Sequence, residues 1–260
     1  MIVTTIRKPK FETEILAKNT AEKLGLKFVP RKDFGIDALM KMYDAENILL
    51  AKKNALVIWT AEGILYFHPN TAHLRIKNLR QGEGDRLIEV AQIKAGDKIL
   101  DCTLGLGSDA IVESFIVGSA GKVTALEINP ALAEVVRFGM KNFTDDTPPV
   151  IEAMRRVEVV TADYADFLKS AADNSFDVVY FDPMFRHALN KSSGINPIRP
   201  VADHRPIDAD SVREACRVAR RLVVMKENSR SLEFARLGFK IAEGGKHSNI
   251  AFGVIPATYT

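Results

Sequence analysis

The sequence predicts an α/β fold: a doubly wound sheet that ends in an antiparallel hairpin, preceded by a small N-terminal α/β unit. Three observations support this. From residue 93 onward, short apolar stretches alternate with stretches of helical periodicity, as in a parallel sheet covered by helices. A glycine-rich turn, Gly105-Leu106-Gly107, joins the first of these strands to the first helix. Near the end, two short strands flank Glu243-Gly244-Gly245-Lys246, which predicts a hairpin.

Residues 1–70 are expected to form the small accessory domain. Its elements are a strand, two helices and two further strands, at Ile2–Ile6, Glu12–Leu24, Ile36–Tyr43, Ala55–Thr60 and Ile64–Phe67. His68-Pro69-Asn70 interrupts this pattern. Residues 71–92 form a basic lead-in segment that ends in the amphipathic stretch Asp85–Ile93.

Residues 93–260 are expected to form the doubly wound domain. Its strands are predicted at Lys98–Cys102, Lys122–Glu127, Arg156–Val160, Phe176–Asp182 and Arg221–Lys226. Helices fill the gaps, notably at Pro130–Asn142 and Asp208–Ala219, and the hairpin pairs Phe239–Ala242 with Ile250–Val254.

Composition agrees with a cytoplasmic enzyme that has no membrane partner. The 260 residues are 47% hydrophobic, enough to bury one α/β core and a small accessory unit. The apolar runs are too short to span a bilayer, and the first residues lack the order of a signal peptide. Cys102 and Cys216 are expected to be reduced and buried, and no His or Cys cluster suggests a metal site.

The glycine turn predicts a nucleotide-type pocket. It follows Asp101 at a strand end, and the helix after it offers free N–H groups. Glu127 ends the next strand about twenty positions after Gly107, where an acid can accept both ribose hydroxyls. By itself the turn fits a nicotinamide dinucleotide as well, or a connection that binds nothing.

A second motif, Asp182-Pro183-Met184-Phe185, follows the predicted strand Phe176–Asp182. It resembles the Asp/Asn-Pro-Pro-aromatic motif of S-adenosylmethionine-dependent methyltransferases that act on exocyclic amines. Asp182 and the Pro183 carbonyl would accept the two N–H bonds of the amine, and Phe185 would stack on the base. The alternative is an ordinary Asp-Pro turn with Phe185 in the core.

Together these motifs resemble the bacterial 16S rRNA guanine-N2 methyltransferase J family, over roughly residues 73 to 253. The resemblance rests on Asp101-x-Thr103-x-Gly105-Leu106-Gly107-x-Asp109-Ala110, Leu126-Glu127-x-Asn129-Pro130 and Asp182-Pro183-Met184-Phe185-x-His187. It implies a class I methyltransferase fold with an antiparallel last strand, and S-adenosylmethionine as cofactor. The implied cofactor contacts are Ser108, Asp109, Glu127, Ile128, Asp163, Tyr164 and Asp182, beside Asp101, Gly105 and Gly107. The family usually has Arg and Pro where this chain has Ser108 and Arg186.

Asp163 has two interpretations that stay open. It ends the third strand segment, where an acid can accept the adenine amino group. It also precedes a predicted helix over Ala165–Ala172, where it would serve as an N-cap.

Four residues are predicted to bind substrate: Arg75 and Lys77 in the lead-in, and Arg186 and His187 after the second motif. Basic side chains there would hold phosphates without reading sequence. The long segment Arg186–Pro206 would close over the base as a lid. The alternatives are a solvated charged face, since the net charge is only +3, and an insertion without a role.

The leading hypothesis is an S-adenosylmethionine-dependent N-methyltransferase acting on an RNA base, with guanine N2 of small-subunit rRNA favoured. The alternatives are a small-molecule or protein acceptor, an NAD-dependent oxidoreductase, and an inactive RNA-binding module. The sequence leaves the oligomeric state open, a homodimer included.

Overall fold

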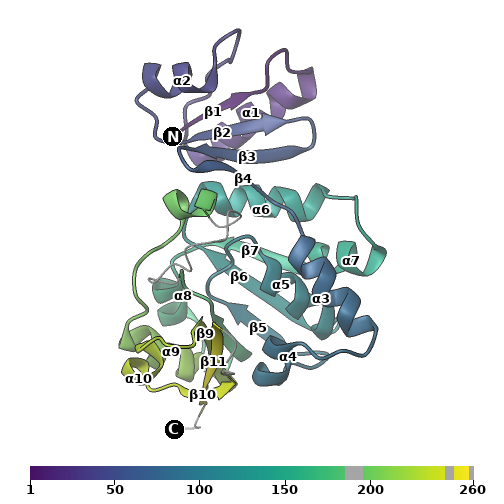
Figure 1. Ribbon diagram of the computed structural model, residues 1–260, viewed down its shortest axis with the longest axis vertical. Coiled ribbons are helices and arrows are strands. Elements are labelled where there is room, and N and C mark those ends of the chain that lie inside the picture. The colour runs from purple at the N-terminus through teal and green to yellow at the C-terminus, as the bar shows by residue number, and fades with distance from the viewer. Residues whose placement is uncertain (185–195, 244–248, 258–260) are drawn as a thin grey trace. The chain divides into compact units, whose positions relative to one another are not determined.

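A computed structural model describes residues 1–184, 196–243 and 249–257 (Figure 1). Contacts within the chain divide it into two compact units. The first comprises Met1–His68, Asn129–Thr144 and residues 196–202. The second comprises Pro69–Ile128, residues 145–184 and the described residues from Asp203 onward. The division of labour between an accessory and a catalytic domain stays a prediction.

The first unit is built on a four-stranded sheet with the order β1-β2-β3-β4. Its strands are β1 (Ile2–Thr5), β2 (Ile48–Lys52), β3 (Ala55–Thr60) and β4 (Gly63–Tyr66). β1 and β2 are parallel, and the other neighbours are antiparallel. The unit also contains α1 (Phe11–Leu24), α2 (Ile36–Met42), α6 (Pro130–Asn142) and a 3₁₀ helix, η1 (Asn196–Val201).

Strand β2 was missing from the sequence-based prediction. Ile48, Leu49, Leu50 and Ala51 are all buried, because β2 pairs with β1 on one side and β3 on the other. A strand buried on both faces is a continuous apolar run, without the alternation that identifies a half-exposed strand.

Helix α6 follows β6 in the chain but packs against β3 of the first unit. Gly139 permits this close approach: a Cβ at this position would lie 2.4 Å from ring atoms of Phe67. Any side chain here would therefore push α6 away from Phe67.

The second unit is built on a seven-stranded sheet with the order β10-β11-β9-β8-β5-β6-β7. Its strands are β5 (Lys98–Asp101), β6 (Lys122–Glu127), β7 (Val157–Thr161), β8 (Phe176–Phe181), β9 (Ala219–Asn228), β10 (Lys240–Glu243) and β11 (Ile250–Pro256). The five neighbouring strands β9, β8, β5, β6 and β7 pair in parallel, and β11 is antiparallel to both of its neighbours, β9 and β10. The predicted fold class, including the antiparallel end, is confirmed.

The helices of this unit are α3 (Asn70–Arg80), α4 (Arg86–Ala91), α5 (Ser108–Val117), α7 (Pro148–Arg156), α8 (Tyr164–Ser170), α9 (Ala209–Val218) and α10 (Glu233–Leu237). The break predicted at His68-Pro69-Asn70 lies between β4 and α3, which begins at Asn70 after its N-cap Pro69. One element boundary differs from expectation. Arg156, predicted to begin a strand, is the last residue of α7. Prolines precede or open both helices, in keeping with the tolerance of helix starts for proline.

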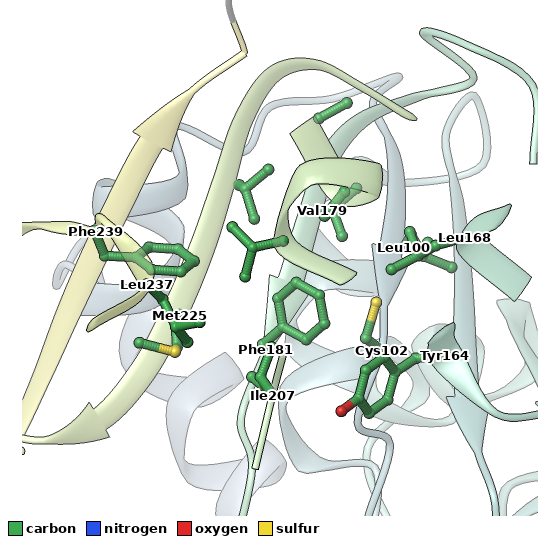
Figure 2. Close-up of a cluster of buried hydrophobic side chains, with 14 of the residues drawn as sticks. Leu100, Cys102, Tyr164, Leu168, Val179, Phe181, Ile207, Met225, Leu237 and Phe239 are labelled. Carbon is green, nitrogen blue, oxygen red and sulfur yellow. The ribbon is translucent and has the colours of Figure 1, made fainter. Parts of the chain in front are cut away.

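Strand β8 alternates between two environments. Phe181 enters a hydrophobic cluster with Tyr164, Leu100 and Met225 (Figure 2). Tyr180 is equally buried, but its hydroxyl hydrogen-bonds to Asp109 of α5. Since successive side chains of a strand point to opposite faces, the two sides of β8 serve the core and a polar cluster respectively.

Strand β5 lies between β6 and β8. The chain passes from β5 to β6 on one side and, after β7, crosses back to β8 on the other side. In open α/β sheets ligands bind outside the carboxyl ends of the strands at such a switch point. In the described part of the chain, no helix combines the length and apolar character needed to cross a membrane.

Candidate active site

The glycine turn begins where β5 ends at Asp101. Gly105 and Gly107 have φ values of 51° and 79°, in the left-handed region that glycine adopts without a Cβ penalty. Gly107 caps α5 without a side-chain hydrogen bond, so the first turn of the helix keeps N–H groups for a ligand. The predicted strand, glycine turn and helix are thus all present.

Asp101 lies almost completely buried beneath this turn. Its Oδ1 accepts a 2.9 Å hydrogen bond from the backbone N–H of Thr103. Burial raises the pKa of Asp101 to about 8, and the nearby carboxylates of Asp109 and Asp182 act in the same direction. The Thr103 hydroxyl in turn accepts a 2.6 Å hydrogen bond from the backbone N–H of Asp182, which joins the turn to the end of β8.

Asp109, in the first turn of α5, receives three donors. Arg75 of α3 hydrogen-bonds to Oδ1, while Tyr180 and Lys226 donate to Oδ2 across 2.9 and 3.0 Å. Burial raises the pKa of this carboxyl, but the charges of Lys226 and Arg75 outweigh it and hold the pKa well below its usual range. Asp109 is therefore an ionised carboxylate held in one orientation.

Asp182 lies at the carboxyl end of β8, directly before Pro183 and Met184. Its Oδ2 accepts a 2.7 Å hydrogen bond from Lys226 at the end of the neighbouring strand β9. Burial raises the pKa of Asp182 to about 6; Lys226 lowers it, and Asp109 raises it. The carboxyl thus titrates in the range where enzymes commonly work.

Glu127 and Ile128 stand at the end of β6, beside β5 in the sheet. Glu127 is 8% exposed, and its backbone carbonyl accepts a hydrogen bond from Ala162 after β7. The glycine turn also reaches this strand, because the N–H of Leu104 donates to the carbonyl of Leu126 across 2.8 Å. The acid predicted for the ribose therefore lies next to the turn predicted for the rest of the nucleotide.

Asp163 is the N-cap of α8, as one of its two interpretations predicts. Oδ1 accepts a 2.8 Å hydrogen bond from the N–H of Ala165, and Oδ2 accepts one of 2.9 Å from Arg205. Tyr164, the next residue, packs its ring edge-on against Phe181 at 5.7 Å between centroids (Figure 2). Capping and contact with adenine are compatible, and the second role stays a prediction.

Of the four residues predicted to bind substrate, the structure describes Arg75 and Lys77, both on α3. The guanidinium of Arg75 donates two hydrogen bonds of 2.7 and 2.9 Å to Asp85, in addition to its hydrogen bond to Asp109. Lys77, on the same helix, is exposed. With its guanidinium held by two carboxylates, Arg75 is better suited to positioning Asp109 than to binding phosphate. Phe185, Arg186 and His187 lie outside the described residues.

Sequence reasoning did not single out Lys226, Tyr180, Asp85 or Glu113. Lys226 carried the clearest signal, as a lone cation after the apolar run Leu222–Met225 at a strand's carboxyl end. Glu113 lies on α5 one turn after Asp109 and is fully buried, and neither of its carboxyl oxygens has a partner among the described residues. Burial and the carboxylates of Asp101 and Asp109 raise its pKa well above the usual value.

A small pocket adjoins the end of β8. Its lining, which includes both apolar and charged side chains, is formed by Pro183, Met184, Arg205, Pro206, Ile207, Met225, Glu227 and Glu233. Among the described residues, no group of three or more His, Cys, Asp or Glu side chains is placed to hold a metal ion.

The sequence model of a family described as "Putative SAM-dependent methyltransferase" matches residues 37–238. The chain belongs to this family. It is also 36% identical to the uncharacterized protein YpiP of Bacillus subtilis over 98% of each chain. The methyltransferase is 34% identical to ribosomal RNA small subunit methyltransferase J of Actinobacillus pleuropneumoniae over 56% of its own length and 58% of that relative. It thus matches little more than half of that J methyltransferase.

Comparison of structures gives the same fold. The S-adenosylmethionine-dependent methyltransferase NGO1261 of Neisseria gonorrhoeae superposes with a TM-score of 0.65 over 99% of this methyltransferase and 96% of its own chain, at 18% identity. The family match and the antiparallel end of the sheet exclude the alternative of a nicotinamide-dependent enzyme. The protein is an S-adenosylmethionine-dependent methyltransferase.

The residues of the glycine turn fit this cofactor. The Ser108 hydroxyl oxygen, at the start of α5, is buried and has no hydrogen-bond partner in the described part of the chain. A buried hydroxyl without a partner is costly, so a ligand group at this turn would satisfy it.

Proposed function

We propose that this methyltransferase acts on an exocyclic amine of an RNA base, with guanine N2 of small-subunit rRNA as the favoured target. The observation that carries the proposal is the position of Asp182, Pro183 and Met184 at the carboxyl end of β8. They lie one hydrogen bond away from the glycine turn, through Thr103. The J methyltransferase named above supports the choice of rRNA.

The cofactor would be held by Gly105, Gly107 and Ser108 of the turn, by Asp109 behind it, and by Glu127, Ile128, Asp163 and Tyr164 at the adjacent strand ends. Asp101 would support the turn from below through Thr103. When bound, S-adenosylmethionine supplies an electrophilic methyl group.

The acceptor amine would be oriented by Asp182 and by the carbonyl of Pro183. A base amine is a weak nucleophile because its lone pair is delocalised into the ring. Two acceptors on its N–H bonds hold the nitrogen still and favour a localised lone pair, so positioning supplies most of the rate. The methylated nitrogen loses its extra proton to water. No general base is needed, and His187 has no assigned proton-transfer role.

The base must be unpaired or flipped out to reach the end of β8. Phe185, which would stack on it, lies outside the described residues. The pocket next to Pro183 and Met184 offers apolar side chains for the ring, and Glu227 adds a carboxylate for an N–H group; the other acid of the lining, Glu233, is paired with Arg236. This lining suits a base that presents donors, as the amine edge of guanine does.

The test offers radiolabelled S-adenosylmethionine with four acceptors in parallel: free 16S rRNA, assembled small subunits, total cell protein and a small-molecule extract. RNA and subunits are taken from cells lacking this gene, so that the target is unmethylated. We expect label in rRNA, recovered after nuclease digestion as N2-methylguanosine. Label confined to protein or to small molecules would refute the rRNA proposal.

The variant Asp182→Ala tests the role of this carboxylate in the methyl-transfer step. Turnover should fall by roughly 10²-fold or more, because the amine loses an orienting acceptor. Cofactor binding, measured by calorimetry, should weaken only modestly. Asp210→Asn, at an exposed acid of α9, should leave both unchanged.

A further inference from the structure

Lys226 hydrogen-bonds both to Asp109, in the first turn of α5, and to Asp182, which follows β8. Its Nζ lies 2.7 Å from Oδ2 of Asp182 and 3.0 Å from Oδ2 of Asp109. The three side chains are between 14% and 26% exposed, so water screens the charges weakly. One ammonium group therefore bridges the cofactor turn and the acceptor motif.

The two acids do not depend on this lysine equally. Asp109 also receives Arg75 and Tyr180. Among the described residues, Lys226 is the only cation hydrogen-bonded to Asp182. Asp182 therefore depends on Lys226 for a compensating charge, whereas Asp109 keeps one if Lys226 is lost.

The two carboxyl oxygens of Asp182 differ in their hydrogen-bond partners. Oδ2 receives Lys226, while Oδ1 has no donor in the described part of the chain. A carboxylate with one oxygen fixed by a cation presents the other in a defined direction. That free oxygen is the one available to an amine N–H.

We propose that Lys226 is a positioning residue for methyl transfer, holding Asp182 ionised and fixing Oδ2 so that Oδ1 accepts the amine. The proposal rests on the proposed function only in naming an amine as what Oδ1 receives. The ionisation of Asp182 by Lys226 is a property of the protein alone.

The charged surroundings of Asp182 support this assignment. Burial and the carboxylates of Asp109 and Glu227 raise its pKa, and Lys226 opposes them. The carboxyl of Asp101, the phenol of Tyr180 and the buried acid Glu113 also belong to this cluster, and Arg75 joins it through Asp109. Without Lys226, the neighbours that act on Asp182 among the described residues are the acids Asp109 and Glu227, so its pKa must rise.

The direct test follows the carboxyl carbon of Asp182 by NMR in protein labelled with ¹³C-aspartate, without cofactor or acceptor. The signal is assigned by its absence in Asp182→Asn. In Lys226→Met we expect the titration midpoint to move up by one pH unit or more. Lys226→Arg, which keeps the charge, should stay near the wild type. An unchanged midpoint in Lys226→Met would overturn the proposal.

One control variant and one further measurement on the wild-type protein keep the test decisive. Lys122→Met, at an exposed lysine that opens β6, should leave the midpoint unchanged. If Lys226→Met does not fold, the wild-type protein still answers, because the ¹⁵Nζ signal of Lys226 must shift with the same midpoint as Asp182. Independent midpoints for the two groups would contradict the bridge.

Kinetics then separate positioning from a merely structural role. With an active acceptor, the acid limb of kcat should move to higher pH in Lys226→Met, with partial recovery in alkaline buffer. A structural role would lower kcat equally at every pH. If the rRNA assay fails while the NMR shift is observed, the choice of acceptor is wrong and the role of Lys226 in ionising Asp182 stands.

Discussion

The hydroxyl of Tyr180 donates a 2.9 Å hydrogen bond to Oδ2 of Asp109. This bond joins the buried end of β8 to the first turn of α5, so the central strand orients the acid behind the glycine turn. Burial raises the pKa of Tyr180 well above its usual value, so the phenol keeps its proton and stays a donor at neutral pH.

Tyr180→Phe should therefore weaken both the fold and the cofactor site. A lost hydrogen bond to a carboxylate costs about 1–3 kcal/mol, and the lower half of that range applies because Asp109 keeps two other donors. Urea unfolding measures the first effect and calorimetric titration with S-adenosylmethionine the second. Tyr66→Phe, at an exposed tyrosine of β4, should change neither. Equal behaviour of the two variants would show that the bond contributes nothing.

Arg75→Met should destabilise the protein by about 3–5 kcal/mol, because it leaves the buried carboxylates of Asp85 and Asp109 without their shared partner. Cofactor affinity should fall with it. Adding Asp85→Asn should recover part of the lost stability, as a double-mutant cycle in urea would reveal. Arg80→Met, at an exposed residue of the same helix, is the matched control. Weaker RNA binding at unchanged stability would instead favour phosphate binding by Arg75.

Two substitutions of Asp163 should separate its two roles. Asp163→Ala removes the N-cap of α8 and should cost about 1 kcal/mol of stability, together with cofactor affinity. Asp163→Ser keeps a capping oxygen but no carboxylate, so stability should be nearly retained while cofactor affinity falls. Thermal unfolding and calorimetry measure the two quantities. Full cofactor affinity in the serine variant would leave capping as the only role.

Stability should fall as pH rises above about 4, because burial raises the pKa of Asp101 to about 8 in the folded protein. Between the unfolded and the folded pKa the native state binds the extra proton. The contribution of Asp101 is thus complete at low pH and is lost as pH rises through 8. The slope for one such proton approaches roughly 1.4 kcal/mol per pH unit.

Asp101→Asn should flatten this decline, measured as urea midpoints from pH 5 to 9. Glu113→Gln should act in the same direction, since the pKa of Glu113 is also raised. Asp145→Asn, at an exposed acid, should leave the slope as in the wild type. A wild-type profile that rises with pH over this range would contradict the assignment of a protonated Asp101.

Local patterns predicted the parts of the molecule that local forces decide. The strand, glycine turn and helix around Gly107 depend on neighbouring residues, as does the hairpin at the end of the sheet. Lys226 and Asp109 are separated by 117 positions, and Lys226 and Asp182 by 44. No period or motif encodes such contacts, so the bridge could not be found before the strand order was known. The contact of Arg75 with Asp109 was missed for the same reason, since the two residues lie 34 positions apart.

The placement of α6 was unpredictable for a related reason. Its sequence shows an amphipathic helix between two strands of one sheet, and every local rule assigns it to that sheet. Its buried face instead meets β3. Amphipathic periodicity states that one face is covered but not which element covers it.

This interleaving determines the order in which the protein can be completed on the ribosome. The four-stranded sheet is translated by residue 66, yet it lacks α6 until residue 142 and η1 until residue 201 has emerged. The face of β3 that α6 covers must therefore stay uncovered until β5 and β6, the first two strands of the seven-stranded sheet, have been made. Deleting residues 1–70 would in turn remove the strand β3 that α6 packs against. We therefore expect neither residues 1–70 nor the rest of the chain to fold stably alone.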